Sequence, residues 1–152
     1  MLDVRETILL RLKALLDLEA DGTGLLARAY RNTNELPEQS RPCGVLFDGA
    51  EEAADQDHKR HGNSPRRITM RPQILLLVSE QPENVGAALS AVRAALMYRL
   101  LDDTELNGLS LNGEGIVYEG CTPFIQSGRV IEGTMLLSFS ILYLLKPADL
   151  AP

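Results

Sequence analysis

The strongest constraint in this sequence is the alternation of residues near its C-terminal end. Nearly every second residue over positions 131–145 is apolar: Ile131, Met135, Leu137, Phe139, Ile141, Tyr143 and Leu145, with Gly133 in the same series. This two-residue period predicts a β-strand with one face in the core, far longer than the usual strand of about 5–6 residues. The opposite face begins polar and ends in Leu142 and Leu144. Because that end is apolar on both faces, a second surface must cover it, and we interpret it as an assembly surface.

An earlier segment shows the same pattern. Apolar side chains alternate with polar ones from residue 67 onward, at Ile68, Met70, Ile74, Leu76 and Val78. Leu75 and Leu77 then make the second face apolar as well, so we expect another long strand with the same change along its length. Pro72 lies within it. Because proline has no N–H to donate to a ladder, Pro72 predicts an edge position, a bulge or an outward-facing nitrogen.

Two segments have the period of an amphipathic helix. Residues 3–19 place apolar side chains on one side and charged side chains on much of the rest. In a second segment, Pro82 and Glu83 suit the first turn of a helix, and apolar residues then recur at helical spacing as far as Leu100.

The remaining segments are short. Strand-like runs are expected near residues 25–31, 43–47 and 116–121, and turns at Asp48-Gly49, Asn107-Gly108, Asn112-Gly113 and residues 123–128. Runs of strands with two interposed helices predict a single α+β domain over residues 1–152, with a mainly antiparallel sheet and two helices packed on one face.

Composition narrows the class of protein. The formal net charge of −6 argues against general nucleic-acid binding through a basic surface. Cys43 and Cys121 have no zinc spacing, which predicts a reduced pair of small core residues. The apolar stretch 135–145 is too short to span a bilayer as a helix, so we expect a soluble, cytosolic protein. No phosphate loop, nucleophile elbow or zinc motif is present, and we therefore predict no enzyme, no catalytic residue and no cofactor.

Residues 50–65 lose apolar periodicity and predict a long, exposed, charged loop. Acidic residues come first in this region, and basic residues follow them into the next strand. Such segregated charges could pair with opposite charges on a neighbouring copy or partner, or contact nucleic-acid phosphates; a plain polar loop and strand edge is the alternative. The candidate interface residues are Glu51, Glu52, Asp55, Asp57, Lys59, Arg60, Arg66, Arg67, Arg71, Leu142 and Leu144.

The same loop contains a weak metal-binding pattern. Its carboxylates and imidazoles are close in sequence: Asp55, Asp57, His58 and His61. Oxygen and nitrogen donors of this kind bind divalent metals. Lys59 and Arg60 lie among them and would repel a cation, so we favour a solvated charged loop and assign no metal ligand.

Several short segments carry a family resemblance. Tyr30-Arg31-Asn32, Arg41-Pro42, the run Val45 to Gly49 and Glu51-Glu52 precede the charged loop and the long strand. In this order the chain resembles the tail terminator proteins of long-tailed bacteriophages.

The resemblance implies a structural role. Proteins of that family have an α+β fold and form hexameric rings that cap the tail tube, stop its polymerisation and present a surface to the head connector. The implied partners are further copies of the chain, the tail tube protein and the head-tail connector protein, with DNA at most passing through the lumen and no membrane. The implied location is the virion tail, assembled in the host bacterial cytoplasm. Another neck or tail-completion protein, a small metal-dependent enzyme and a cytosolic ligand-binding domain are the alternatives.

Overall fold

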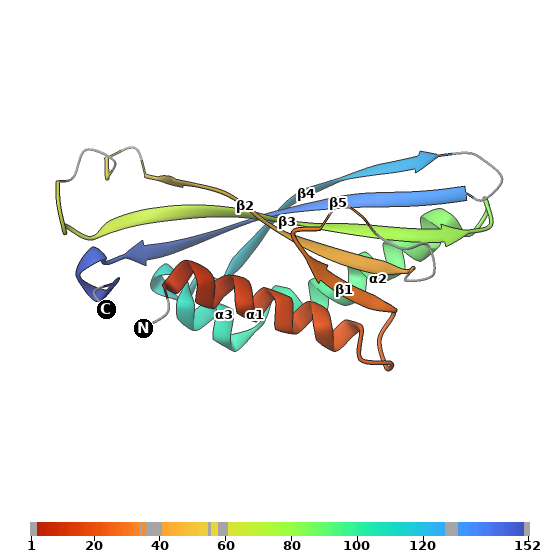
Figure 1. Ribbon diagram of the computed structural model, residues 1–152, viewed down its shortest axis with the longest axis horizontal. Coiled ribbons are helices and arrows are strands. Elements are labelled where there is room, and N and C mark those ends of the chain that lie inside the picture. Colours follow the sequence, from red (N-terminus) through yellow and green to blue (C-terminus); the bar gives the residue numbers. More distant parts are fainter. Residues whose placement is uncertain are drawn as a thin grey trace.

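The long alternating strands lie at the centre of the sheet (Figure 1). The computed structural model describes residues 3–33, 35, 41–54, 56–57, 61–126 and 131–150. Within them the elements in chain order are α1 (Val4–Glu19), β1 (Arg28–Arg31), β2 (Cys43–Ala53), β3 (Arg66–Glu80), α2 (Val85–Leu100), α3 (Thr104–Leu109), the 3-10 turn η2 (Leu111–Gly113), β4 (Ile116–Gln126), β5 (Ile131–Leu145) and the 3-10 turn η3 (Pro147–Leu150).

The strands form one mixed sheet in the order β1-β2-β3-β5-β4. β1 pairs with β2 in parallel, and the other neighbouring pairs are antiparallel. The predicted α+β class, the single domain and the mainly antiparallel sheet are therefore confirmed.

One face of the sheet builds the core. The alternating residues of β3 and β5 meet in register, with Ile74 opposite Leu137 and Leu76 opposite Met135, and all four side chains are buried. The apolar residues of α1 and α2 join them in the same cluster. Figure 1 shows α1 and α3 below the sheet, and α2 contacts β3 and β5. At Gly133 the close approach needs glycine, because a Cβ there would lie 2.5 Å from the Val85 side chain of α2.

Both long helices match the predicted periodicity. α1 buries Leu12, Leu15 and Leu16, and the Asp3 side chain caps its first turn by accepting the N–H of Arg5. α2 begins at Val85, two residues after Glu83, so the predicted start was slightly early.

β2 is longer than predicted. Asp48 and Gly49 do not form a turn; a bulge lies between Phe47 and Ala50, after which pairing with β3 resumes and continues to Ala53. Gly49 has a φ of +73°, and a Cβ there would lie 2.0 Å from the Arg71 carbonyl oxygen, so the bulge requires glycine. The first part of the predicted 50–65 loop is therefore strand. Pro72 lies opposite this bulge in a central strand, which excludes the edge position and fits the bulge alternative.

The region before and within β4 also differs from the prediction. Asn107-Gly108 lies inside α3, because the Asp103 side chain caps that helix and Leu106 is fully buried in the core. β4 continues to Gln126, so the part of the predicted 123–128 turn that is described is strand. Cys121 is exposed on β4 and is not the core residue that we expected, whereas Cys43 is buried.

An ion cluster joins α1 to the sheet. The Arg31 guanidinium of β1 donates to both carboxylate oxygens of Glu6 on α1, at 2.8 and 2.9 Å, and to both of Asp48 on β2, also at 2.8 and 2.9 Å. These hydrogen bonds hold the pKa of the Glu6 and Asp48 carboxyls below their ordinary values. Carboxyls with a depressed pKa stabilise the fold above their unfolded pKa, and this stabilisation is lost as pH falls through the folded pKa.

We therefore predict that Arg31→Gln destabilises the protein in a pH-dependent way. The difference in free energy of unfolding from wild type should be largest at neutral pH and should shrink below about pH 4, where the unfolded carboxyls protonate. Urea unfolding of both proteins at a series of pH values from about 2 to about 7 measures this difference. Arg28→Gln, at an exposed arginine of the same strand, is the control and should show no such trend. A difference constant with pH would contradict the prediction.

A second prediction concerns the core face of α1. Leu12 is 1% exposed, whereas Leu10 on the same helix is 45% exposed. Leu12→Ala should lower the free energy of unfolding by about 2–5 kcal/mol, because it removes buried apolar contacts and leaves a cavity. Leu10→Ala should change it by about 0.5 kcal/mol or less. Equal losses in chemical denaturation would show that this helix face is wrongly assigned.

Candidate assembly interface

The two long central strands and β2 project past the start of α1 (Figure 1). We call this part the distal end; it comprises residues 50–53 of β2, 66–71 of β3 and 141–145 of β5. Here Glu52 lies opposite Thr69, and Thr69 lies opposite Leu142. One face of this end belongs to the core, because Ile68, Met70, Ile141 and Tyr143 are buried there.

The opposite face carries the residues of interest. Its side chains alternate with the buried ones, and we call them the outer distal patch: Glu52, Arg67, Thr69, Arg71, Leu142 and Leu144. Leu142 and Leu144 are half-buried on β5, the outermost strand of the distal end, beside Thr69 and Arg67 respectively. The predicted two-faced apolar end of β5 is thus present. No described helix lies over this side of the distal end in Figure 1.

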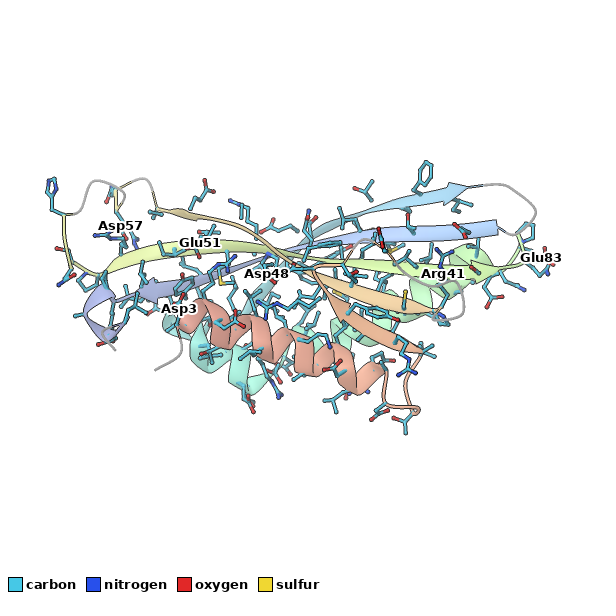
Figure 2. The ribbon with its side chains drawn as sticks, viewed as in Figure 1. Asp3, Arg41, Asp48, Glu51, Asp57 and Glu83 are labelled. Carbon is cyan, nitrogen blue, oxygen red and sulfur yellow. The ribbon has the colours of Figure 1, made fainter. Side chains whose placement is uncertain are left out.

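Arg67 is held by a buried carboxylate. The Asp57 side chain is 3% exposed, and its Oδ2 accepts hydrogen bonds from the Arg67 backbone N–H at 2.6 Å and from the Arg67 Nε at 2.9 Å. The hydrogen bond that the Arg67 guanidinium donates to Asp57 raises the pKa of that guanidinium. Figure 2 shows Asp57 near the tip of the projecting strands. The prediction of a fully exposed 50–65 loop is wrong at Asp57, because this ion pair draws its carboxylate inward.

The other predicted charges separate between the two faces. Glu52 and Arg71 form an exposed pair at 2.9 Å within the outer distal patch. Glu51 lies on the core side, where its Oε2 accepts the Tyr143 hydroxyl at 3.0 Å and pairs with the Arg5 Nε at 3.2 Å. Burial, followed by this hydrogen bond, raises the pKa of Tyr143. Glu51 therefore braces α1 against β5 and does not belong to the outer patch.

The structure describes only some of the predicted basic residues. Arg66 donates from its guanidinium to the Gly62 carbonyl oxygen at 2.8 Å, within its own loop. Asp55, Lys59 and Arg60 lie outside the described residues, as does His58. The segregated acids and bases that are described pair within the chain, at Asp57–Arg67 and Glu52–Arg71, so their contact with another copy stays a prediction.

The weak metal pattern gains no support from the described residues. The Asp57 carboxylate is engaged by Arg67, and His61 is exposed. In the part of the chain that the structure describes, no group of three His, Cys, Asp or Glu side chains has the geometry to hold a metal ion.

Sequence reasoning missed one residue of this surface. Val117 of β4 is 49% exposed and lies opposite Ser140 of β5, so its side chain is on the same outer face. The apolar run Ile116-Val117-Tyr118 was the available signal, because Val117 cannot share the buried face of Ile116. The apolar part of the outer face thus continues beyond the predicted leucines.

The described helices provide no membrane-spanning segment, since none of them combines the length and the apolar character that crossing a bilayer needs.

The buried and the exposed ion pair should contribute differently to stability. Asp57→Ala removes the acceptor of the Arg67 backbone N–H and should cost about 1–3 kcal/mol. Glu52→Ala removes an exposed pair and should cost about 0–1 kcal/mol. Urea unfolding of both variants measures the difference. If Glu52→Ala were as damaging as Asp57→Ala, burial would not be what strengthens the Asp57 contact.

Comparison with known proteins adds no family to these observations. No protein-family model matches the chain, and a search of curated proteins finds no similar sequence. The role of the chain is therefore proposed from its own residues and from the resemblance that its sequence carries.

Proposed function

We propose that this chain is a structural tail protein of a long-tailed bacteriophage or prophage, with the role of a tail terminator. Copies of it would form a ring, hexameric by the family resemblance, at the head-proximal end of the tail tube. The ring ends tube polymerisation and provides the joining surface for the head connector. The role needs no catalysis and no cofactor, and DNA at most passes through the lumen. Its location would be the virion tail, with assembly in the host bacterial cytoplasm.

The outer distal patch is the single observation that carries this proposal. Protein interfaces commonly place apolar residues at the centre and polar residues at the rim. Leu142 and Leu144 are the apolar residues of the patch, and the charges beside them are already neutralised in pairs at Arg67–Asp57 and Arg71–Glu52. Paired charges cost less to cover than isolated ones, because each retains its partner when water leaves. The patch is therefore suited to contact with protein.

The proposed mechanism is geometric. One face of the ring matches the growing end of the tube, and the other face lacks the surface that the next tube ring would need. Addition of tube protein therefore stops, and the connector binds instead. Heterologous contacts between copies close into a ring when the rotation between neighbours closes.

A charge in place of an apolar residue of the patch should prevent assembly without unfolding the chain. Leu142→Asp and Leu144→Asp each place a carboxylate where a neighbour would bury it, and both side chains lie away from the core. Light scattering should report a mass that falls from an oligomer to a monomer, with an unchanged circular dichroism spectrum. Leu18→Asp, at a 43% exposed leucine of α1, is the matched control and should assemble normally. A full ring formed by Leu144→Asp would contradict the proposed interface.

Imaging tests the terminator role itself. Negative-stain images of the protein with purified tail tubes should show density at one tube end. Rings that bind a connector and leave tubes uncapped would instead support a neck or tail-completion protein. Absence of rings and of tube binding would overturn the proposed function.

A further inference from the structure

The distal end has two free strand edges. β1 pairs with β2 only from Cys43 to Leu46, so within the described residues nothing pairs with Ala50–Ala53 on that side. β4 pairs with β5 only as far as Ile141, so Leu142–Leu145 has a described strand on one side alone. The two free segments are equal in length and lie on opposite sides of β3.

A cavity lies next to the end of β5. It has a volume of about 300 Å³ and is lined by Leu144 and Leu145, together with residues of α1, α3 and the turns that follow α3 and β5. Consecutive strand residues point to opposite faces. A cavity that touches both of them therefore lies at the side or at the end of the strand, so this part of β5 is not closely packed on every side.

Pairing of the β5 edge with the β2 edge is more favourable than pairing of the β2 edge with the β2 edge of another copy. The β5 segment Leu142–Leu145 has no charge and is followed by Lys146, which has no ion-pair partner among the described residues. The β2 segment carries Glu51 and Glu52. Pairing β2 with β2 of another copy would bring like charges together, which is destabilising. An uncharged edge beside an acidic one avoids that cost.

The topology and the direction of the ring axis together determine the direction of such a contact. β2 and β5 are both antiparallel to β3, so they run the same way. If the ring axis lies close to the strand direction, rotation from one copy to the next leaves the direction of the strands unchanged. β5 of one copy then meets β2 of the next copy in parallel. The same edge of β2 already accepts a parallel partner, β1, between Cys43 and Leu46.

We propose that the ring closes by strand addition: the Leu142–Leu145 edge of one copy pairs in parallel with the Ala50–Ala53 edge of the next copy. When the first residues of the two segments are aligned, Ala50 lies beside Leu142. Glu52 is then diagonal to Lys146 on the outer face. Glu52 stays paired with Arg71, but its side chain is 65% exposed, so the carboxylate is accessible to a second cation. This inference rests on the proposed ring and specifies how neighbouring copies join.

The edge of β4 is less suited to strand addition. β4 contains Pro123, which offers no N–H, and a bulge between Tyr118 and Gly120. Prolines and bulges on edge strands obstruct pairing with another chain. β4 nevertheless carries the exposed Val117, so it provides a competing junction for the experiment to exclude.

Cysteine cross-linking tests the junction. In a Cys121→Ser background, Ala50→Cys is combined with Leu142→Cys or, for a slipped register, with Leu144→Cys. Neighbouring strands lie about 4.8 Å apart, within disulfide range. Oxidation should give a ladder of covalent oligomers on a non-reducing gel. The matched control combines Ala50→Cys with Val117→Cys and should give monomers.

A charge swap tests it without cysteines. Glu52→Lys and Lys146→Glu should each weaken assembly at low salt by about 5-fold or more, equivalent to about 1 kcal/mol. The double variant should recover most of the loss, because it restores opposite charges. Failure of the double variant to recover overturns the Glu52–Lys146 contact.

The outcomes separate this inference from the proposed function. In one outcome, light scattering detects rings although neither the Ala50–Leu142 nor the Ala50–Leu144 cross-link forms, or although a Val117 cross-link forms. Either result overturns strand addition and does not contradict the terminator role. Cross-linked rings that fail to cap tubes support strand addition and overturn the terminator role. A chain that stays monomeric with and without tubes overturns both.

Discussion

The ladder between β3 and β5 is the interaction on which the rest of the structure depends. It begins at Arg66 opposite Leu145 and ends at Glu80 opposite Ile131, with a gap in pairing beside Pro72. One face of this ladder supplies the core against α1 and α2, and the other remains open at the distal end. Because successive side chains alternate between faces, a ladder of this length fixes both the packing of the helices and the position of the outer patch.

Regular periodicity explains which parts of the fold were predictable. The alternation around Met135 and Leu137, and the helical spacing of α1, identify elements whose buried faces are uninterrupted. The second half of β2 was not predicted, because Asp48-Gly49 is typical of a turn and the adjacent Glu51 and Glu52 interrupt the alternation of apolar and polar residues. α3 escaped for a related reason: Asn107-Gly108 favours a turn locally, but burial of Leu106 against the core overrides that preference.

The candidate interface was predictable only where it depends on alternation. Leu142 and Leu144 follow from the period of β5, whereas the burial of Asp57 depends on a contact with Arg67 that no period encodes. Glu51 and Glu52 are adjacent in sequence and were treated alike, yet strand geometry sends them to opposite faces. Glu51 therefore contacts α1, and Glu52 remains at the surface. A run of charged residues thus identifies a region of interest but does not show which contacts each residue makes.

The bulge and proline of β4 have a consequence for solubility. Long apolar edge strands promote open-ended stacking of chains into fibrils. Here Pro123 and the bulge before Gly120 interrupt the longer open edge. The shorter edge at Leu142–Leu145 ends at Lys146 and Pro147. Sheet growth is thereby obstructed along β4 and limited to a short segment at the end of β5, while the molecule retains its elongated shape.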